Sequence, residues 1–162
     1  AGSRKEDTYY QWSAMEREMA EARTGEADDA AVAANWHAAA EIAQLGIDRI
    51  GPTKALCNLA GYARSREAKT KQRLNQFGDA ERCFAEAADY FRRSLGAPSS
   101  DNRPIQQGIL FRGLVLAYEG LEDLPRLAGS LRDWAEAEPD DYYCTTERDR
   151  LMMRFPALMA GR

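Results

Sequence analysis

The sequence predicts an all-α protein in which helices stack as antiparallel pairs. Between breaks that contain glycine or proline, every segment carries apolar residues at spacings of three and four, and none alternates like a half-buried strand. The 162 residues, with 44% apolar and 30% charged side chains, are enough for one soluble domain with its own core. The breaks fall at Gly25, 46–52, Gly78, 96–104, 120–125 and 139–141.

The first two predicted helices cover about residues 6–24 and about residues 28–45. In the first, Trp12, Met15 and Met19 form one apolar stripe together with Ala22. The second is rich in alanine, and small side chains let two helix axes approach closely. Its apolar positions are Val32, Trp36, Ala39, Ala40 and Ala43.

The third predicted helix begins at Gly51-Pro52-Thr53, where a proline in the first turn loses no helical hydrogen bond. Its apolar spacing continues to about Phe77. The pair Gly78-Asp79 then ends this helix and caps a fourth helix, which runs to about Leu95.

The fifth and sixth helices follow the 96–104 loop and are separated by the break at 120–125, with Pro125 starting the sixth. A last helix is expected to open near Thr145 or Thr146, because Thr146 and Asp149 have the spacing of a capping box, and to end at Pro156. The seven helices pair as first with second, third with fourth and fifth with sixth. We therefore expect a right-handed α-α superhelix of about three degenerate pairs plus a C-terminal capping helix.

The segment 111–139 has the spacing of one tetratricopeptide repeat: an aromatic residue, then leucine, a small residue and tyrosine, then a second helix closed by proline. The chain resembles this family over about residues 5–155, specifically in the last pair and loosely in the first two. If Gly78-Asp79 is the family's Gly-Asp turn, the third helix has about eleven extra residues, nearly three turns, so its apolar face keeps its phase. The residues that carry the resemblance in the last pair are Phe111, Leu114, Val115, Tyr118, Leu127, Leu131, Trp134 and Pro139.

The resemblance implies a ligand groove along the inner face made by the first helix of each pair. Carried over by position, the partner-binding residues are Lys54, Asn58, Gly61 and Arg64 from the third helix and Arg112, Leu116 and Glu119 from the fifth. Lys54 and Asn58 resemble part of a carboxylate clamp, but Ile109 and Gly113 stand where its further Lys and Arg are expected, so a full clamp is not expected. The predicted function is a scaffold, adaptor or regulatory module that binds a peptide or helix of a partner protein.

A basic stretch in the third helix, Arg64–Arg73, suggests an alternative function. Arg66, Lys69 and Arg73 share one helix face. This face is either a solvated surface, a site for an acidic peptide, or a site for the backbone of a nucleic acid. The net charge of −4 favours the peptide, because nucleic-acid-binding domains are usually basic. A nucleic-acid-associated helical domain remains the alternative.

No motif predicts catalysis, a metal site or a cofactor. The three cysteines form no Cys-x-x-Cys pair, and phosphate-binding and nucleophile-elbow motifs do not occur in the sequence. We expect a protein that is not an enzyme; an enzyme or small-molecule sensor would instead show an enclosed pocket around His37 and Cys57.

Composition also bears on location and assembly. No apolar run approaches the roughly 20 residues that cross a bilayer, and scattered cysteines are typical of a reducing compartment, so we expect a cytoplasmic protein without membrane contact. Residues 1–3 are typical of a cloning scar, which leaves one helical-repeat domain at 4–162. Tyrosines at both ends predict either a homo-oligomer or packing beneath the terminal helices; they are Tyr9, Tyr10, Tyr142 and Tyr143.

Overall fold

The computed structural model describes residues 2–23, 28–100 and 103–159, and these residues contain seven α-helices, a short 3₁₀-helix and no β-strand. The prediction of an all-α fold is confirmed. The elements are α1 (Gly2–Arg23), α2 (Asp29–Ile50), α3 (Lys54–Arg73), α4 (Phe77–Gly96), α5 (Gln107–Leu121), α6 (Leu124–Ala137), α7 (Tyr142–Arg154) and η1 (Pro156–Met159).

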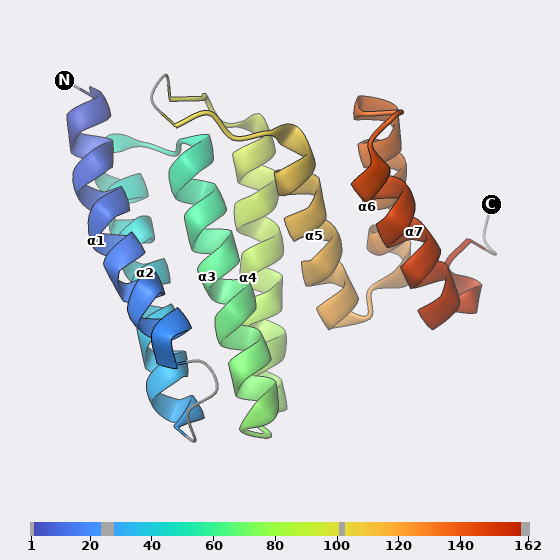
Figure 1. Cartoon of the computed structure of the whole chain (residues 1–162), viewed down its shortest axis with the longest axis horizontal. Helices are drawn as coiled ribbons and strands as arrows, with labels where there is room; N and C mark the ends of the chain where they lie inside the picture. Colours follow the sequence, from blue (N-terminus) through green and yellow to red (C-terminus); the bar gives the residue numbers. More distant parts are fainter. Residues whose placement is uncertain (1, 24–27, 101–102, 160–162) are drawn as a thin grey trace.

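The helices form two layers of a stack (Figure 1). The odd-numbered helices α1, α3, α5 and α7 lie side by side, and each contacts the next one in this layer. The even-numbered helices α2, α4 and α6 lie behind them, each packed on its neighbours in sequence. The layer of odd-numbered helices therefore offers one continuous face, in which the first helix of each pair takes part.

The turn between α3 and α4 lies earlier than the sequence predicts. α3 ends at Arg73, and Asn75 takes the left-handed conformation with φ 60°. Phe77 then begins α4 with a side chain that is 63% exposed. The prediction that α3 runs to Phe77 is therefore wrong. The extra length is shared, since α1 and α2 have 22 residues each and α3 and α4 have 20 each.

The last helix also begins earlier than predicted. Asp141 caps α7 by accepting a hydrogen bond from the Tyr143 amide at 2.9 Å. Thr146, predicted as the cap, lies inside the helix, and its hydroxyl donates to the Tyr142 carbonyl at 2.9 Å. A threonine can bond to a carbonyl one turn back as readily as it can cap, so the capping-box spacing was not decisive here.

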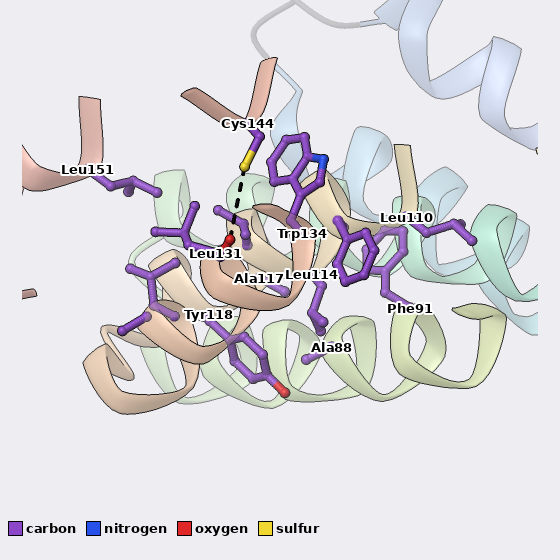
Figure 2. Close-up of a cluster of buried hydrophobic side chains, with 14 of the residues drawn as sticks. Ala88, Phe91, Leu110, Leu114, Ala117, Tyr118, Leu131, Trp134, Cys144 and Leu151 are labelled. Carbon is purple, nitrogen blue, oxygen red and sulfur yellow. Dashed lines mark hydrogen bonds between the residues drawn. The ribbon is translucent and has the colours of Figure 1, made fainter. Parts of the chain in front are cut away.

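The largest core cluster lies between α4, α5, α6 and α7 (Figure 2). The Phe111 and Trp134 rings stack with centroids 6.5 Å apart. The Cys144 thiol lies 4.0 Å from the Leu131 carbonyl oxygen (Figure 2). Leu151 is fully buried and holds α7 on this cluster. The apolar residues that the sequence assigned to the last helix pair are thus its core.

None of the helices in the described part of the chain combines the length and apolarity needed to span a bilayer.

Candidate functional site

A groove opens between α1, α3 and α5 on the face of the odd-numbered helices. Its cavity has a volume of about 410 Å³. Phe84 and Phe91 from α4 form its floor, and the other side chains come from the three helices of the front layer. The lining residues are Tyr10, Arg17, Asn58, Leu59, Tyr62, Ser65, Arg66, Lys69, Phe84, Phe91, Ile109, Arg112, Gly113 and Leu116.

Two glycines explain why an aromatic floor fits between α3 and α5. A Cβ atom at Gly113 would lie within 3.0 Å of the Phe91 ring, and one at Gly61 would lie 3.0 Å from it. Larger residues at these positions would displace the ring. A clamp arginine at position 113 would clash with the ring for the same reason.

The groove is strongly positive. Four cationic side chains line it, Arg17, Arg66, Lys69 and Arg112, and no acidic residue is among the described residues that line it. Two of these cations form ion pairs with carboxylates that lie outside the cavity. Arg17 Nε lies 3.3 Å from Glu21, and Arg112 Nε lies 3.7 Å from Glu147 of α7.

Arg66 and Lys69 form the centre of this groove, and among the described residues neither has a carboxylate within 4.0 Å; Glu119 acts on Lys69 only from a longer distance. The Arg66 guanidinium lies 5.8 Å from the ring centroids of both Trp36 and Tyr62, a cation–π arrangement that leaves its hydrogen-bond donors available. Lys69 is exposed overall, but partial desolvation of its ammonium, followed by repulsion from Arg66, lowers its pKa. The charge of an anion bound here would offset both effects on the pKa of Lys69.

The groove continues toward α7. A second cavity of about 880 Å³ shares Lys69, Phe84, Arg112 and Leu116 with the first. Its far wall includes Glu147, Arg150 and Arg154 from α7. A third cavity of about 720 Å³ adjoins at Ile109 and Arg112 and reaches Trp134 and Tyr143. Together the cavities make a path across α1, α3, α5 and α7.

The structure brings five of the sequence-predicted site residues together in this groove. They are Asn58, Arg66, Lys69, Arg112 and Leu116. The first three come from α3, where Lys69 is exposed and the other two are half-buried, and the last two lie one turn apart on α5. Three of them, Asn58, Arg112 and Leu116, are among the seven expected peptide-binding positions. The other two, Arg66 and Lys69, belong to the predicted basic face of three residues.

Lys54 and Gly61 are placed elsewhere. The Lys54 ammonium donates to the carbonyls of Ser94 and Leu95 at 2.9 and 2.8 Å, so it closes the C-terminal end of α4. Gly61 is buried against the Phe91 ring. Neither residue lines the groove cavity.

Arg64 is buried in an ion-pair network between α2, α3 and α4. Its guanidinium lies 2.8 Å from Glu67, 2.9 Å from Glu86 and in contact with Glu41. Glu67 has a side chain only 1% exposed and also pairs with Lys71 at 3.0 Å. Burial alone would raise the pKa of Glu67, but hydrogen bonds and charge from Arg64 and Lys71 outweigh it and leave the pKa below its ordinary value.

Glu119 and Arg73 also have structural partners. Glu119 accepts from Arg150 at 2.8 Å and from Arg154, which ties α5 to α7 in the second cavity. Arg73 lies 3.2 Å from Asp29 of α2 and is thereby held away from Arg66 and Lys69. The basic face of the third helix is thus divided between the groove and the contact with α2.

His37 and Cys57 lie in different surroundings. His37 Nδ1 is 3.1 Å from Glu67 Oε2 at the edge of the ion-pair network. Cys57 is fully buried in a cluster with Ala43, Ala60 and other apolar residues, and this burial raises the pKa of its thiol.

Sequence reasoning missed the contribution of α1 to the groove. Tyr10 and Arg17 lie seven residues apart, two helical turns, and both line the cavity. The spacing of Tyr10 and Arg17 is compatible with one shared helix face. The apolar stripe of Trp12 and Met19 instead suggests that the opposite side of α1 is the one that packs, and in the structure that side is exposed.

Comparison of the chain with protein-family models, with curated proteins and with solved structures finds no match.

Proposed function

We propose that this protein is a non-catalytic interaction module, similar to a tetratricopeptide-repeat domain, that binds an acidic peptide or helix of a partner protein. The observation that carries the proposal is the groove between α1, α3 and α5, which is lined by four cations and no described acid over an aromatic floor. The spacing of 111–139 and the stacking of helix pairs support the comparison with the repeat family.

The groove suits a peptide for two physical reasons. Packed helices already hold its side chains, so the domain loses little conformational entropy on binding. Arg66, Lys69 and Arg112 would hold carboxylates through charge-assisted hydrogen bonds, while Phe91 and Leu116 would bury apolar side chains of the same ligand. The expected ligand therefore combines Asp or Glu with apolar residues.

A peptide is favoured over a nucleic acid. A phosphate backbone is best met by an extended row of exposed cations, and here Arg73 is paired with Asp29 and so breaks the row. The rings nearest the cations are also occupied, because Tyr62 and Trp36 contact one another edge to face with centroids 5.6 Å apart and have Arg66 above them. Neither of these two rings is therefore free to stack on a base beside Arg66.

The proposal includes a cytoplasmic location, in keeping with three separate buried thiols, as expected in a reducing compartment; they are Cys57, Cys83 and Cys144.

The test is selection of a random displayed peptide library on the 162-residue chain, followed by fluorescence anisotropy with the enriched peptides. We expect sequences that mix acidic and apolar residues. Replacing Arg66 and Lys69 together by Glu should weaken binding at least about tenfold, because each lost charge-assisted hydrogen bond contributes about 1.5–3 kcal/mol. Arg132→Glu, which changes an exposed cation on α6, is the matched control and should leave affinity unchanged.

Two results would contradict the proposal. One is selection of peptides without acidic residues, or binding that survives the Arg66 and Lys69 double change. The other is tight binding of a labelled oligothymidine that competes with every selected peptide and weakens steeply with salt, which would assign the groove to a nucleic acid.

A further inference from the structure

The positive charge on the face of the odd-numbered helices is concentrated in one cavity. The groove cavity of about 410 Å³ is lined by four cations and by no acid among the described residues. The adjoining cavity of about 880 Å³ is lined by four cations and four acids, so its charges balance. Lys69 and Arg112 line both cavities. The excess of positive charge therefore lies between α1, α3 and α5.

Two acids of the adjoining cavity act on the shared cations, and both are already paired with arginines of α7. Glu119 lies 2.8 Å from Arg150 and contacts Arg154. Glu147 lies 2.7 Å from Arg150, and its separation from Arg112 is longer, at 3.7 Å. These carboxylates therefore neutralise α7 more than they neutralise the groove.

A tyrosine of α3 brings two of the groove arginines together. The guanidiniums of Arg17 and Arg66 lie 5.4 and 5.8 Å from the centroid of the Tyr62 ring. Arg66 also lies 5.8 Å from the ring centroid of Trp36, which is buried. Cation–π contacts use none of the N–H donors of a guanidinium. Arg66 is therefore held one helical turn from Lys69 on α3, with donors left for a ligand.

Repulsion among these cations acts on Lys69, which lies between α3 and α5. Desolvation of its ammonium lowers its pKa most, and repulsion from Arg66 lowers it further. Arg150 and Arg112 add to this repulsion, while Glu119 acts in the opposite direction. An anion with more than one charge would offset the repulsion at this point.

Several carboxylates of one peptide match this cluster poorly. In an extended chain neighbouring side chains point to opposite sides, so those on the same side are about 7 Å apart. Bringing two of them to one point costs Coulomb repulsion. A phosphorylated side chain instead places about 1.5–2 negative charges and three acceptor oxygens on one group. Guanidiniums bind such a group through paired N–H···O bonds.

We propose that the anion recognised by the groove is a phosphorylated side chain of the partner peptide, bound by Arg66 and Lys69 of α3 and by Arg112 of α5. The inference rests on the proposed function, because it names the group of the acidic peptide on which binding depends. Phe91 and Leu116 line the same cavity and would contact an apolar neighbour of the phosphorylated residue. Phosphorylation of the partner would therefore switch binding on.

A single phosphate fits this cluster better than the backbone of a nucleic acid. A backbone needs cations in an extended row. Along α3, Arg64 is buried in its own ion pairs, and Arg73 lies 3.2 Å from Asp29 of α2. The cations of α3 that remain available, Arg66 and Lys69, are one turn apart and form a cluster instead of a row.

The test uses peptide pools with random sequence around one fixed phosphoserine or phosphotyrosine, bound to the 162-residue chain. The best sequence is then synthesised with the phosphorylated residue, with glutamate or with the unmodified residue at that position. Fluorescence anisotropy at constant ionic strength compares the three forms. We expect the phosphorylated form to bind at least about tenfold more tightly than the glutamate form, and the unmodified form to bind most weakly.

Lys69→Gln and Arg112→Gln test the placement of the phosphate. Both side chains are exposed, so circular dichroism of the variants should be unchanged. Each change should weaken binding of the phosphorylated form at least about tenfold and that of the glutamate form less, because the charge removed faces about two charges instead of one. Arg132→Gln, at an exposed position of α6, is the matched control and should leave all affinities unchanged.

Three results would overturn the inference. Equal affinities for the phosphorylated and glutamate forms would remove the phosphate and leave the acidic-peptide proposal intact. Displacement of the phosphopeptide by inorganic phosphate at concentrations similar to the peptide's own would assign the cavity to a small anion. An oligothymidine that binds more tightly than the phosphopeptide would assign it to a nucleic acid. If neither phosphorylated nor unmodified acidic peptides bind, the proposed function fails together with the inference.

Discussion

Replacing Arg64 by leucine tests the buried ion-pair network directly. Its guanidinium, with a side chain 8% exposed, faces Glu67 at 2.8 Å, and the Glu67 side chain is 1% exposed. Leucine removes the charge and leaves the Glu67 carboxylate in place without its nearest partner. An ionised group left in an interior is costly because little solvent remains to stabilise it.

The magnitude follows from the burial of each partner. Removing one member of a buried pair costs about 3–5 kcal/mol. Glu67 keeps Lys71 at 3.0 Å and His37 at 3.1 Å, which reduces the loss. The contacts of Arg64 with Glu41 and Glu86 add little, since these carboxylates are 56% and 44% exposed and surface pairs contribute about 0–1 kcal/mol. We expect a loss of about 3 kcal/mol, or about 6–12 °C in Tm for a chain of this size.

The assay is urea unfolding followed by circular dichroism between pH 7 and pH 3. Because the pKa of Glu67 is lowered in the folded state, its contribution is present above its ordinary pKa of 4.5 and is lost as pH falls through the folded value. Arg64→Leu should therefore lower stability at pH 7 and flatten the decline toward acid. At pH 3 the variant and the wild type should differ less.

The double variant Arg64→Leu with Glu67→Leu separates charge from packing. It should be more stable than Arg64→Leu alone, with a coupling energy of at least about 1 kcal/mol, because it removes the stranded carboxylate. The reasoning would be refuted by a single variant within about 0.5 kcal/mol of the wild type, the range of ordinary surface substitutions. Strictly additive effects of the two changes would refute it equally.

Three further predictions concern the groove and a buried thiol. Gly113→Ala displaces the Phe91 ring and should lower the free energy of unfolding by about 1–3 kcal/mol. Gly129→Ala places a Cβ at an ordinary contact distance of 3.8 Å from the Arg132 guanidinium and should raise the free energy of unfolding by up to about 1 kcal/mol. Thermal melts compare the two variants. The pKa of Lys69 should lie below its ordinary value of 10.5, because desolvation and the neighbouring Arg66 guanidinium lower it. NMR titration of the reductively methylated protein measures this pKa. An ordinary value would contradict the description of Lys69 as a cation without a close carboxylate partner. Burial raises the pKa of the Cys83 thiol to about 11. At pH 8 this thiol should therefore react with a thiol reagent only in unfolded chains. Prompt reaction in the native protein would contradict the burial of Cys83.

Local signals predicted most of the fold. The spacing of Phe111, Leu114 and Tyr118 and of Leu131 and Trp134 placed the last helix pair correctly, and all five residues are buried. Helix ends were less predictable. Where two capping signals compete, as at the start of α7, the choice depends on a difference of about 1 kcal/mol or less between caps, which spacing alone does not reveal.

The candidate site was predicted in part. Arg64 and Arg66 were both candidates for partner binding, yet two residues on a helix lie about 200° apart, so a groove on one side of α3 can take only one of them. The structure gives Arg66 to the groove and Arg64 to the contact with α2 and α4. The spacing of two residues in the sequence predicts the angle between their side chains around a helix. It does not predict which side of that helix faces its neighbours.

The amino-acid sequence by itself determined that this chain is helical, in what order its helices follow one another, and that a basic stretch lies in its middle, because these properties arise from neighbours within a few residues. Tertiary packing decided which cations meet in the groove, which are neutralised, and that the stripe of Trp12, Met15 and Met19 faces outward. An amphipathic stripe shows only that a helix has a side suited to burial. Whether that side is covered depends on the position of the helix in the stack, and α1 stands at its end.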